Sequence, residues 1–199
     1  MEGIKNYFLA VSFLTGALAL PLCAHAADEY AIDKTHSTFG FSVTHLMVSK
    51  VPGQFNEYDG KVIFDANDLA ASKIDVTIQT ASINTNVEKR DAHLKTVDFF
   101  DAEKFSTITF VSKAIAKEGD QYKVTGDLTL KGVTKEIAFP VTIAGPVKSP
   151  KGDAVIGIEA SFKINRQDYG ITWNKALDNG GFMVSDEVNV NISVEAHKK

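Results

Sequence analysis

The histidines of this chain are the side chains best suited to metal or acid–base chemistry. His36, His45 and His93 lie in the body of the sequence, and His197 lies close to its C-terminus. Imidazole is a common zinc ligand, so His36, His45 and His93 could together support a metal-assisted hydrolase. None of them belongs to an H-x-H or H-E-x-x-H motif. We therefore predict no metal site, favour a turn-forming hydrogen bond for His36, and keep the hydrolase as an alternative.

Arg90, Asp91 and His93 form a second polar group, in a stretch rich in helix formers. On a helix, Arg90 and His93 would be neighbours at i,i+3. Such a group could bind the head group of an anionic ligand, or it could pin the helical stretch to the rest of the fold through charge-assisted hydrogen bonds. We favour the pinning role. For Arg166 and Asp168 we likewise expect a structural ion pair.

Nucleophilic catalysis finds little support in the sequence. No serine lies in a G-x-S-x-G motif, and no glycine-rich phosphate loop is present. The only cysteine, Cys23, lies close to the N-terminus. We therefore predict no catalytic residues and no cofactor, and an enzyme is the weaker hypothesis.

The first 26 residues have the pattern of a secretory signal. Lys5 is followed by an apolar run and then by Ala24-His25-Ala26, a small-x-small cleavage site. We predict cleavage after Ala26, a mature domain at 27–199, and a periplasmic location. Acylation of Cys23 is an alternative, but Leu22 stands where a lipoprotein signal needs a small residue. No later apolar run is long enough to span a membrane, so no integral membrane span is expected.

The charge pattern excludes one class of partner. The net charge is −4, and lysines are interspersed with acidic residues along the chain. A nucleic-acid-binding protein needs a basic stripe or patch. We therefore expect no nucleic-acid partner.

Period-two alternation of apolar and polar residues dominates the chain, which predicts half-buried antiparallel strands. In the first long run, Phe39, Phe41, Val43 and His45 share one face. Turn signals separate the runs. We predict about eight or nine strands and a single domain. The runs cover 30–33, 39–45, 60–65, 74–78, 108–110, 122–130, 137–143, 156–164 and 188–194, and the turn signals include Pro52-Gly53, Gly119, Gly132, Gly145-Pro146 and Gly152.

The stretch from Ser82 to Phe100 is the exception, because it lacks alternation. It predicts one short helix around residues 87–95, capped by Asn84, Thr85 or Asn86. A helix inserted here, followed by Phe99-Phe100, would form a lid or plug at one end of a barrel.

Many short antiparallel strands can form a sandwich or a closed barrel, and an eight-stranded barrel can be solid or can hold one ligand. Aromatic side chains on the inward faces and in the closing segments favour an apolar cavity, although ordinary core packing would explain any one of them. We predict that the wall of an interior tunnel comprises Phe39, Phe41, Val43, His45, Phe99, Phe100, Phe110, Phe139, Ile158, Phe162, Tyr169 and Trp173.

Several motifs follow one another along the chain, among them Phe39-Gly-Phe-Ser-Val-Thr-His45, Arg90-Asp-Ala-His-Leu94, Asp98-Phe-Phe-Asp101 and Ile164-Asn-Arg-Gln-Asp-Tyr-Gly170. This ordered set resembles the YceI-like family of secreted, lipocalin-like bacterial proteins. The resemblance covers nearly all of 27–199. It implies an extended, eight-stranded antiparallel barrel with a short helical insertion, whose elongated pore holds a polyisoprenoid or a similar amphiphile.

The sequence thus predicts an all-β periplasmic carrier for a long-chain isoprenoid lipid, of quinone or polyprenyl phosphate type. Arg90, Asp91 and His93 would contact the head group or anchor the insertion. The lipid is the expected partner, and a homodimer is allowed for. Besides the hydrolase, a ligand-free interaction module with a role in stress is the remaining alternative.

Overall fold

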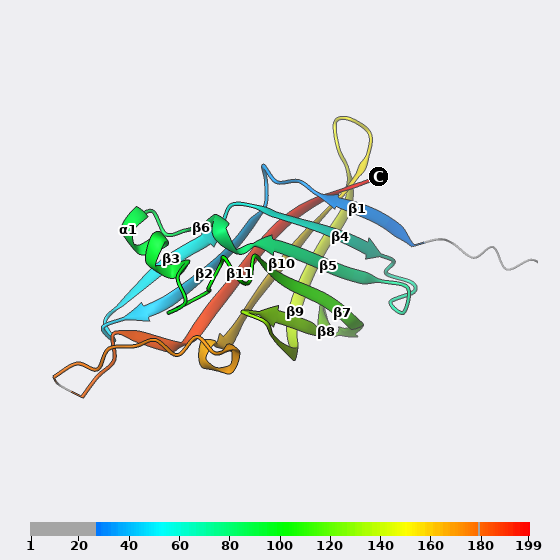
Figure 1. Ribbon diagram of the computed structural model, residues 1–199. Helices are drawn as coiled ribbons and strands as arrows, with labels where there is room; N and C mark the ends of the chain where they lie inside the picture. The colour runs from blue at the N-terminus through cyan, green and yellow to red at the C-terminus, as the bar shows by residue number, and fades with distance from the viewer. Residues whose placement is uncertain (1–26, 179) are drawn as a thin grey trace, which may run out of the picture.

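The alternating runs form antiparallel strands that close into a barrel (Figure 1). The computed structural model describes residues 27–178 and 180–199, so the predicted signal peptide lies outside the described residues. Closure follows from β11, which pairs with β10 on one side and with β1 and β2 on the other. The strand segments are β1 (Asp28–Ile32), β2 (Thr38–His45), β3 (Ser49–Phe55), β4 (Tyr58–Phe64), β5 (Lys73–Gln79), β6 (Ile83–Asn84), β7 (Thr107–Glu118), β8 (Gln121–Leu130), β9 (Val133–Lys148), β10 (Ala154–Asn165) and β11 (Val184–Lys198).

Three pairs of short segments, β1 with β2, β3 with β4 and β5 with β6, each make up one long strand. The eleven segments therefore form the eight strands of the barrel. β1 and β2 both run along β11, with Ile32 opposite Ala196 and Thr38 opposite Ser193. In the same way, β3 and β4 run along β2 and β1, and β6 prolongs β5 past the 3-10 helix Thr80–Ser82. With these pairs counted as one, each strand lies beside its neighbour in sequence. Such up-and-down closure leaves no exposed sheet edge where the pairing is complete.

Two of the predicted turns are wrong, because both lie inside strands. Pro52-Gly53 is in β3, where Pro52 pairs with Ser42 and Gly53 with Phe41. Proline is tolerated there because β3 pairs on its other side only at Gln54 and Phe55. Gly145-Pro146 lies in β9, next to a register shift between β9 and β10 that absorbs the irregular backbone.

The pairing between β9 and β10 is incomplete. It runs from Ala154 opposite Lys148 to Ala160 opposite Val141, although β9 begins at Val133 and β10 continues to Asn165. The two strands therefore separate along this stretch. Side chains, rather than backbone hydrogen bonds, must close the barrel wall there.

The predicted helix is present as α1 (Glu88–Leu94), in the insertion between β6 and β7. It lies at one end of the barrel (Figure 1). The predicted capping is wrong: Val87 is the N-cap residue and has no side-chain cap. Thr85 is instead engaged with the side chains of Arg90 and Asp91, and Asn84 accepts a hydrogen bond from the backbone of Asn86.

The core forms two clusters of buried apolar side chains. One includes Tyr30, Val62 and Ile156, and the other includes Phe99, Tyr169 and Ile171 close to α1. Within residues 27–178 and 180–199, no helix has the length and apolar character needed to cross a membrane.

Candidate ligand-binding site

The barrel encloses a cavity of about 410 Å³, lined by members of both core clusters. This volume lies within the range of about 300–1,000 Å³ that is common for small-molecule sites. The lining is almost wholly aliphatic and aromatic, since alternate residues of most strands point inward. An apolar guest is the chemistry that this wall favours.

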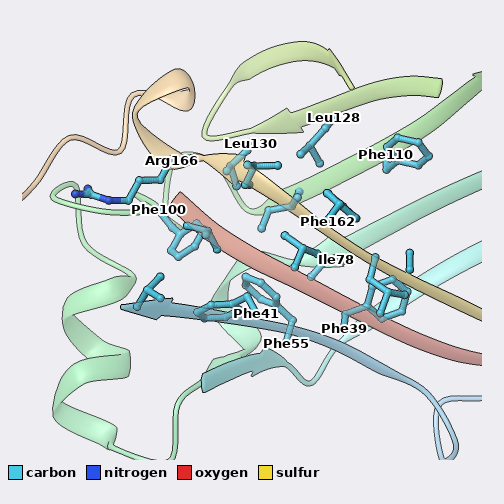
Figure 2. Close-up of a pocket in the computed structure, with 18 of the residues that line it drawn as sticks. Phe39, Phe41, Phe55, Ile78, Phe100, Phe110, Leu128, Leu130, Phe162 and Arg166 are labelled. Atoms are coloured by element: carbon cyan, nitrogen blue, oxygen red, sulfur yellow. The ribbon is translucent and has the colours of Figure 1, made fainter. Parts of the chain in front are cut away.

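The aromatic side chains converge on the cavity from separate strands (Figure 2). Phe39 and Phe41 come from β2, Phe55 from β3 and Phe110 from β7. The ring of Phe55 packs against that of Phe41 with centroids 5.7 Å apart. It also meets Phe100 edge-on, at 5.9 Å. Of the predicted tunnel wall, the residues that line the cavity are Phe39, Phe41, Val43, His45, Phe99, Phe100, Phe110, Phe139, Ile158, Phe162 and Trp173.

Tyr169 is the predicted wall residue that does not line the cavity. It lies in the short 3-10 helix Arg166–Tyr169 and is 2% exposed, in the core cluster beside Phe99 and Ile171. Its buried hydroxyl has no hydrogen-bond partner among the described residues. Burial raises the pKa of this hydroxyl, so it stays neutral.

Phe139 and Phe162 close the wall where β9 and β10 separate. Their rings stack with centroids 4.1 Å apart and an interplanar angle of 14°. The ring of Phe110 extends the contact, tilted by 55° with its centroid 5.3 Å from that of Phe139. Aromatic packing thus replaces the missing ladder hydrogen bonds at this point.

At the α1 end, His93 packs among aromatic rings. Its imidazole meets Phe99 and Trp173 edge-on, with centroids 5.0 and 5.2 Å away, and its Nε2 lies 3.0 Å from Asp98 Oδ2. His93, Phe99 and Trp173 all line the cavity. This cluster places a polar imidazole beside the aromatic rings at the α1 end of the wall.

Arg90 and Asp91 fix the insertion through Thr85, which is 5% exposed. Arg90 Nε donates to Thr85 Oγ1 at 2.7 Å, and Arg90 Nη2 donates to the Thr85 carbonyl at 2.8 Å. Thr85 in turn donates through its backbone N–H and its hydroxyl to Asp91 Oδ1. Arg90 and Thr85 line the cavity and Asp91 does not. All of these hydrogen bonds join residues 85–91, so they hold α1 against the segment that directly follows β6. Pinning of the insertion to the rest of the barrel stays a prediction.

Among the described residues that line the cavity, Arg166 is the most deeply buried charged side chain, and it is 4% exposed. Its guanidinium donates to the carbonyl oxygens of Ser185, Ile171 and Trp173 at 2.8–2.9 Å, and to Asp186 Oδ1 at 3.0 Å. Burial lowers its pKa, and the Asp186 carboxylate opposes that shift. The expected partner was wrong: Asp168 lies near Lys135 instead, at 3.4 Å.

The ionisable side chains of the described cavity lining are His45, Arg90, His93 and Arg166. No carboxylate is among them, and neither is a serine or a cysteine. The site can therefore hold an apolar chain and place cationic or hydrogen-bond-donating groups against a polar or anionic head.

The histidines proposed for a hydrolase do not form one site. His45 and His93 line the cavity, whereas His36 lies outside it and contacts Asp33 and Glu195. In the described part of the chain, the one group of three side chains placed to hold a metal ion contains His36 but neither of the other two.

The model of the YceI-like domain family matches residues 30–196 of the chain. The chain belongs to the YceI-like family. Among curated relatives, the UPF0312 protein SAS2572 of Staphylococcus aureus (strain MSSA476) is 44% identical over 168 residues, which are 84% of this chain and 96% of that protein.

Solved structures show the same YceI-like barrel. The YCEI protein of Campylobacter jejuni is 38% identical with a TM-score of 0.68, covering 78% of this chain and 90% of that one. BcnA of Burkholderia cenocepacia is 26% identical with a TM-score of 0.73, covering 82% and 98%. A domain from Saccharophagus degradans, described as polyisoprenoid-binding, is 16% identical with a TM-score of 0.65, covering 85% and 98%. At that identity the likeness shows the fold alone.

Sequence reasoning left several cavity residues of this YceI-like chain out of the predicted wall. Leu128 and Leu130 alternate in β8 and could have been found from their period-two spacing. Phe55 was left out because Pro52-Gly53 was interpreted as a turn, although both residues lie in β3 together with Phe55. Arg166 carries no such signal, because its carbonyl partners lie up to 19 positions away in sequence.

Proposed function

We propose that this chain is a carrier that holds a long-chain isoprenoid lipid, of quinone or polyprenyl phosphate type, inside its barrel. The observation that supports this most strongly is the apolar cavity of about 410 Å³, whose described ionisable lining groups are all basic. An apolar tail fits the walls, and the basic groups suit a polar head.

The dimensions and the energetics agree with a chain-like guest. Ile158, Ala160, Phe162, Ile164 and Arg166 line the cavity in one row along β10 and past its end. At about 3.3 Å per residue, this row extends about 26 Å, which accommodates several isoprene units. Burial is worth about 0.8 kcal/mol per CH₂, so a few such units give substantial affinity without strong polar contacts.

Arg166 and His93 are the proposed head-group contacts, with Arg90 beside them. All three line the α1 end of the cavity. Arg166 is committed to backbone carbonyls and Asp186, so its contribution to a head group is mainly its positive charge. Asp91 is proposed as an anchor of the insertion and not as a ligand contact, because it bonds to Thr85.

Binding, rather than catalysis, is the proposed activity. The described lining offers histidine and arginine but no carboxylate, serine or cysteine with which a histidine could form a nucleophile–base pair. The S. degradans neighbour described as polyisoprenoid-binding is consistent with this proposal.

Export to the periplasm is part of the proposal, and it rests on the signal-like sequence of residues 1–26. N-terminal sequencing of the protein from a periplasmic fraction should begin at Ala27. A protein recovered intact from the cytoplasm would contradict the proposed location, while leaving the binding proposal testable.

The decisive test is organic extraction of the protein purified from its native compartment, followed by mass spectrometry. We expect a stoichiometric long-chain isoprenoid. Phe41→Asp places a carboxylate on the cavity wall and should abolish retention, whereas Val111→Asp changes a side chain that is 50% exposed and should not. Circular dichroism of both variants checks the fold. A folded wild-type protein that carries no lipid and takes none up from detergent would overturn the proposal.

A further inference from the structure

A group of histidine and carboxylate side chains lies on the outer surface of the barrel, where β1, β11 and the loop before β10 meet. It consists of Asp33, His36, Asp153, Glu195 and His197. Ile32 and Val194, which precede Asp33 and Glu195, line the cavity. Because side chains alternate across a strand, Glu195 and His197 point outward, away from the cavity. In Figure 1 the C-terminal end of β11 lies beside the loop between β9 and β10.

The donor atoms of four of these side chains form a closed ring of short contacts. Asp33 Oδ2 lies 2.7 Å from His36 Nδ1, which lies 3.8 Å from Glu195 Oε1. Glu195 Oε1 lies 3.1 Å from His197 Nε2, which lies 3.7 Å from Asp33 Oδ2. In a tetrahedral zinc site with bonds of about 2.0–2.1 Å, neighbouring ligand atoms are about 3.3 Å apart. The donor atoms of Asp33, His36 and Glu195 all lie within 4.8 Å of one another, and His197 Nε2 is beside two of these residues, Asp33 and Glu195.

The backbone holds this ring in place without help from a ligand. The Asp33 N–H donates to the Glu195 carbonyl at 2.8 Å, and Ser37 Oγ accepts a hydrogen bond from the Glu195 N–H. Asp33 Oδ1 accepts two hydrogen bonds from Thr35, which fixes the carboxylate and leaves Oδ2 for the ring. The turn between β1 and β2 is therefore fixed against β11, and the donor atoms are brought together before any ion binds.

Asp153 holds the ring of His197 in an orientation that a metal ligand could use. Its Oδ2 lies 2.6 Å from His197 Nδ1, on the side of the ring opposite the Nε2 atom that faces Asp33 and Glu195. Zinc-bound histidines characteristically donate their second ring N–H to a carboxylate in this way.

We propose that Asp33, His36 and Glu195 form a binding site for one Zn²⁺ ion, that the neighbouring His197 imidazole completes it as the fourth ligand, and that Asp153 orients His197. Two imidazoles and two carboxylates suit zinc better than calcium or magnesium, which prefer oxygen ligands alone. The ion would tie the turn between β1 and β2 to the C-terminal end of β11, and through Asp153 to the loop before β10. The site lies apart from the lipid cavity and does not depend on the proposed carrier function.

Isothermal titration of the purified protein, stripped with EDTA and titrated with ZnCl₂, tests this proposal. We expect saturable binding of one zinc ion per chain, a rise in the thermal unfolding temperature that EDTA reverses, and no comparable effect of MgCl₂. The variants His36→Gln and His197→Gln should each weaken zinc binding by at least about 10-fold, and Asp153→Asn by about 10- to 100-fold with the stoichiometry unchanged.

Glu159→Gln is the matched control, since Glu159 is an exposed carboxylate on β10 outside the group. It should leave zinc affinity unchanged. Circular dichroism of each variant without zinc confirms that the outward-facing substitutions preserve the fold. The absence of saturable zinc binding by the wild-type protein would overturn the proposal, and so would an unchanged affinity in the folded His36→Gln/His197→Gln double variant.

Discussion

The ring of Phe41 lies over the α-carbon of Gly53, its partner across β2 and β3. A Cβ atom at position 53 would come within 2.4 Å of the Phe41 ring. The glycine therefore lets the ring lie against the barrel wall, instead of standing out into the cavity that it lines. The open interior thus depends on a residue with no side chain.

The first prediction follows from this contact. Gly53→Ala should push the Phe41 ring into the cavity, reducing lipid capacity several-fold and destabilising the fold by about 1–3 kcal/mol through overpacking. Uptake of a fluorescent isoprenoid from detergent, together with urea unfolding, measures both effects. Gly157→Ala is the control, because a Cβ there would meet only Ala144 Cβ, at 3.9 Å. Equal uptake by the two variants would contradict the prediction.

The strands could be predicted from sequence because their inward residues alternate. Ile156, Ile158 and Phe162 in β10 show the period of two plainly. The glycine and proline signals were less reliable. Pro52-Gly53 carries the composition of a turn, yet it lies in β3 because of a packing partner, Phe41, that local sequence does not reveal.

The second prediction concerns Thr85, the buried link between α1 and the barrel. Thr85→Val removes the hydroxyl that donates to Asp91 and accepts from Arg90. A buried partner left without its hydrogen bond costs about 1–3 kcal/mol, so the variant should lose that much unfolding free energy and open the insertion to faster hydrogen exchange. Thr85→Ser keeps the hydroxyl and should lose much less. Unchanged exchange in residues 84–95 of Thr85→Val would argue against the link.

The third prediction concerns the buried cation. Arg166→Met leaves the carbonyls of Ser185, Ile171 and Trp173 without their donor and should lower the unfolding free energy by about 3 kcal/mol in urea. Lys163→Met is the comparison, since the Lys163–Glu187 pair is 61% and 56% exposed. Its loss should cost less than about 1 kcal/mol. Similar losses of unfolding free energy in the two variants would show that the buried contacts of Arg166 stabilise the fold no more than an exposed ion pair does.

The site was less predictable from sequence than the strands, for a physical reason. The inward faces of the strands identified part of the cavity wall, but the polar groups depend on contacts between distant segments. His36 illustrates this: as a lone histidine beside Ser37 it suggested only a turn, and its neighbours Glu195 and His197 approach it only because β11 closes the barrel. Spacing rules for metal ligands cannot detect such a group.

The last prediction addresses the stretch where β9 and β10 separate. The Phe139–Phe162 stack closes the wall there in place of backbone pairing, so removing one ring should open it. Phe162→Ala should cost about 3 kcal/mol of stability and also make a bound fluorescent isoprenoid exchange faster, because the guest gains a route through the wall.

Phe162→Leu keeps an apolar side chain of moderate size at the same place and should retain slow exchange. The comparison separates the closing role of the aromatic ring from a general loss of stability, because both Phe162 variants lose the stack but only Phe162→Ala leaves the position without a side chain that can cover the wall. The two variants are compared under conditions in which their unfolding free energies are equal. If Phe162→Ala then released the guest no faster than Phe162→Leu, the Phe139–Phe162 stack would contribute to core packing but would not close the wall.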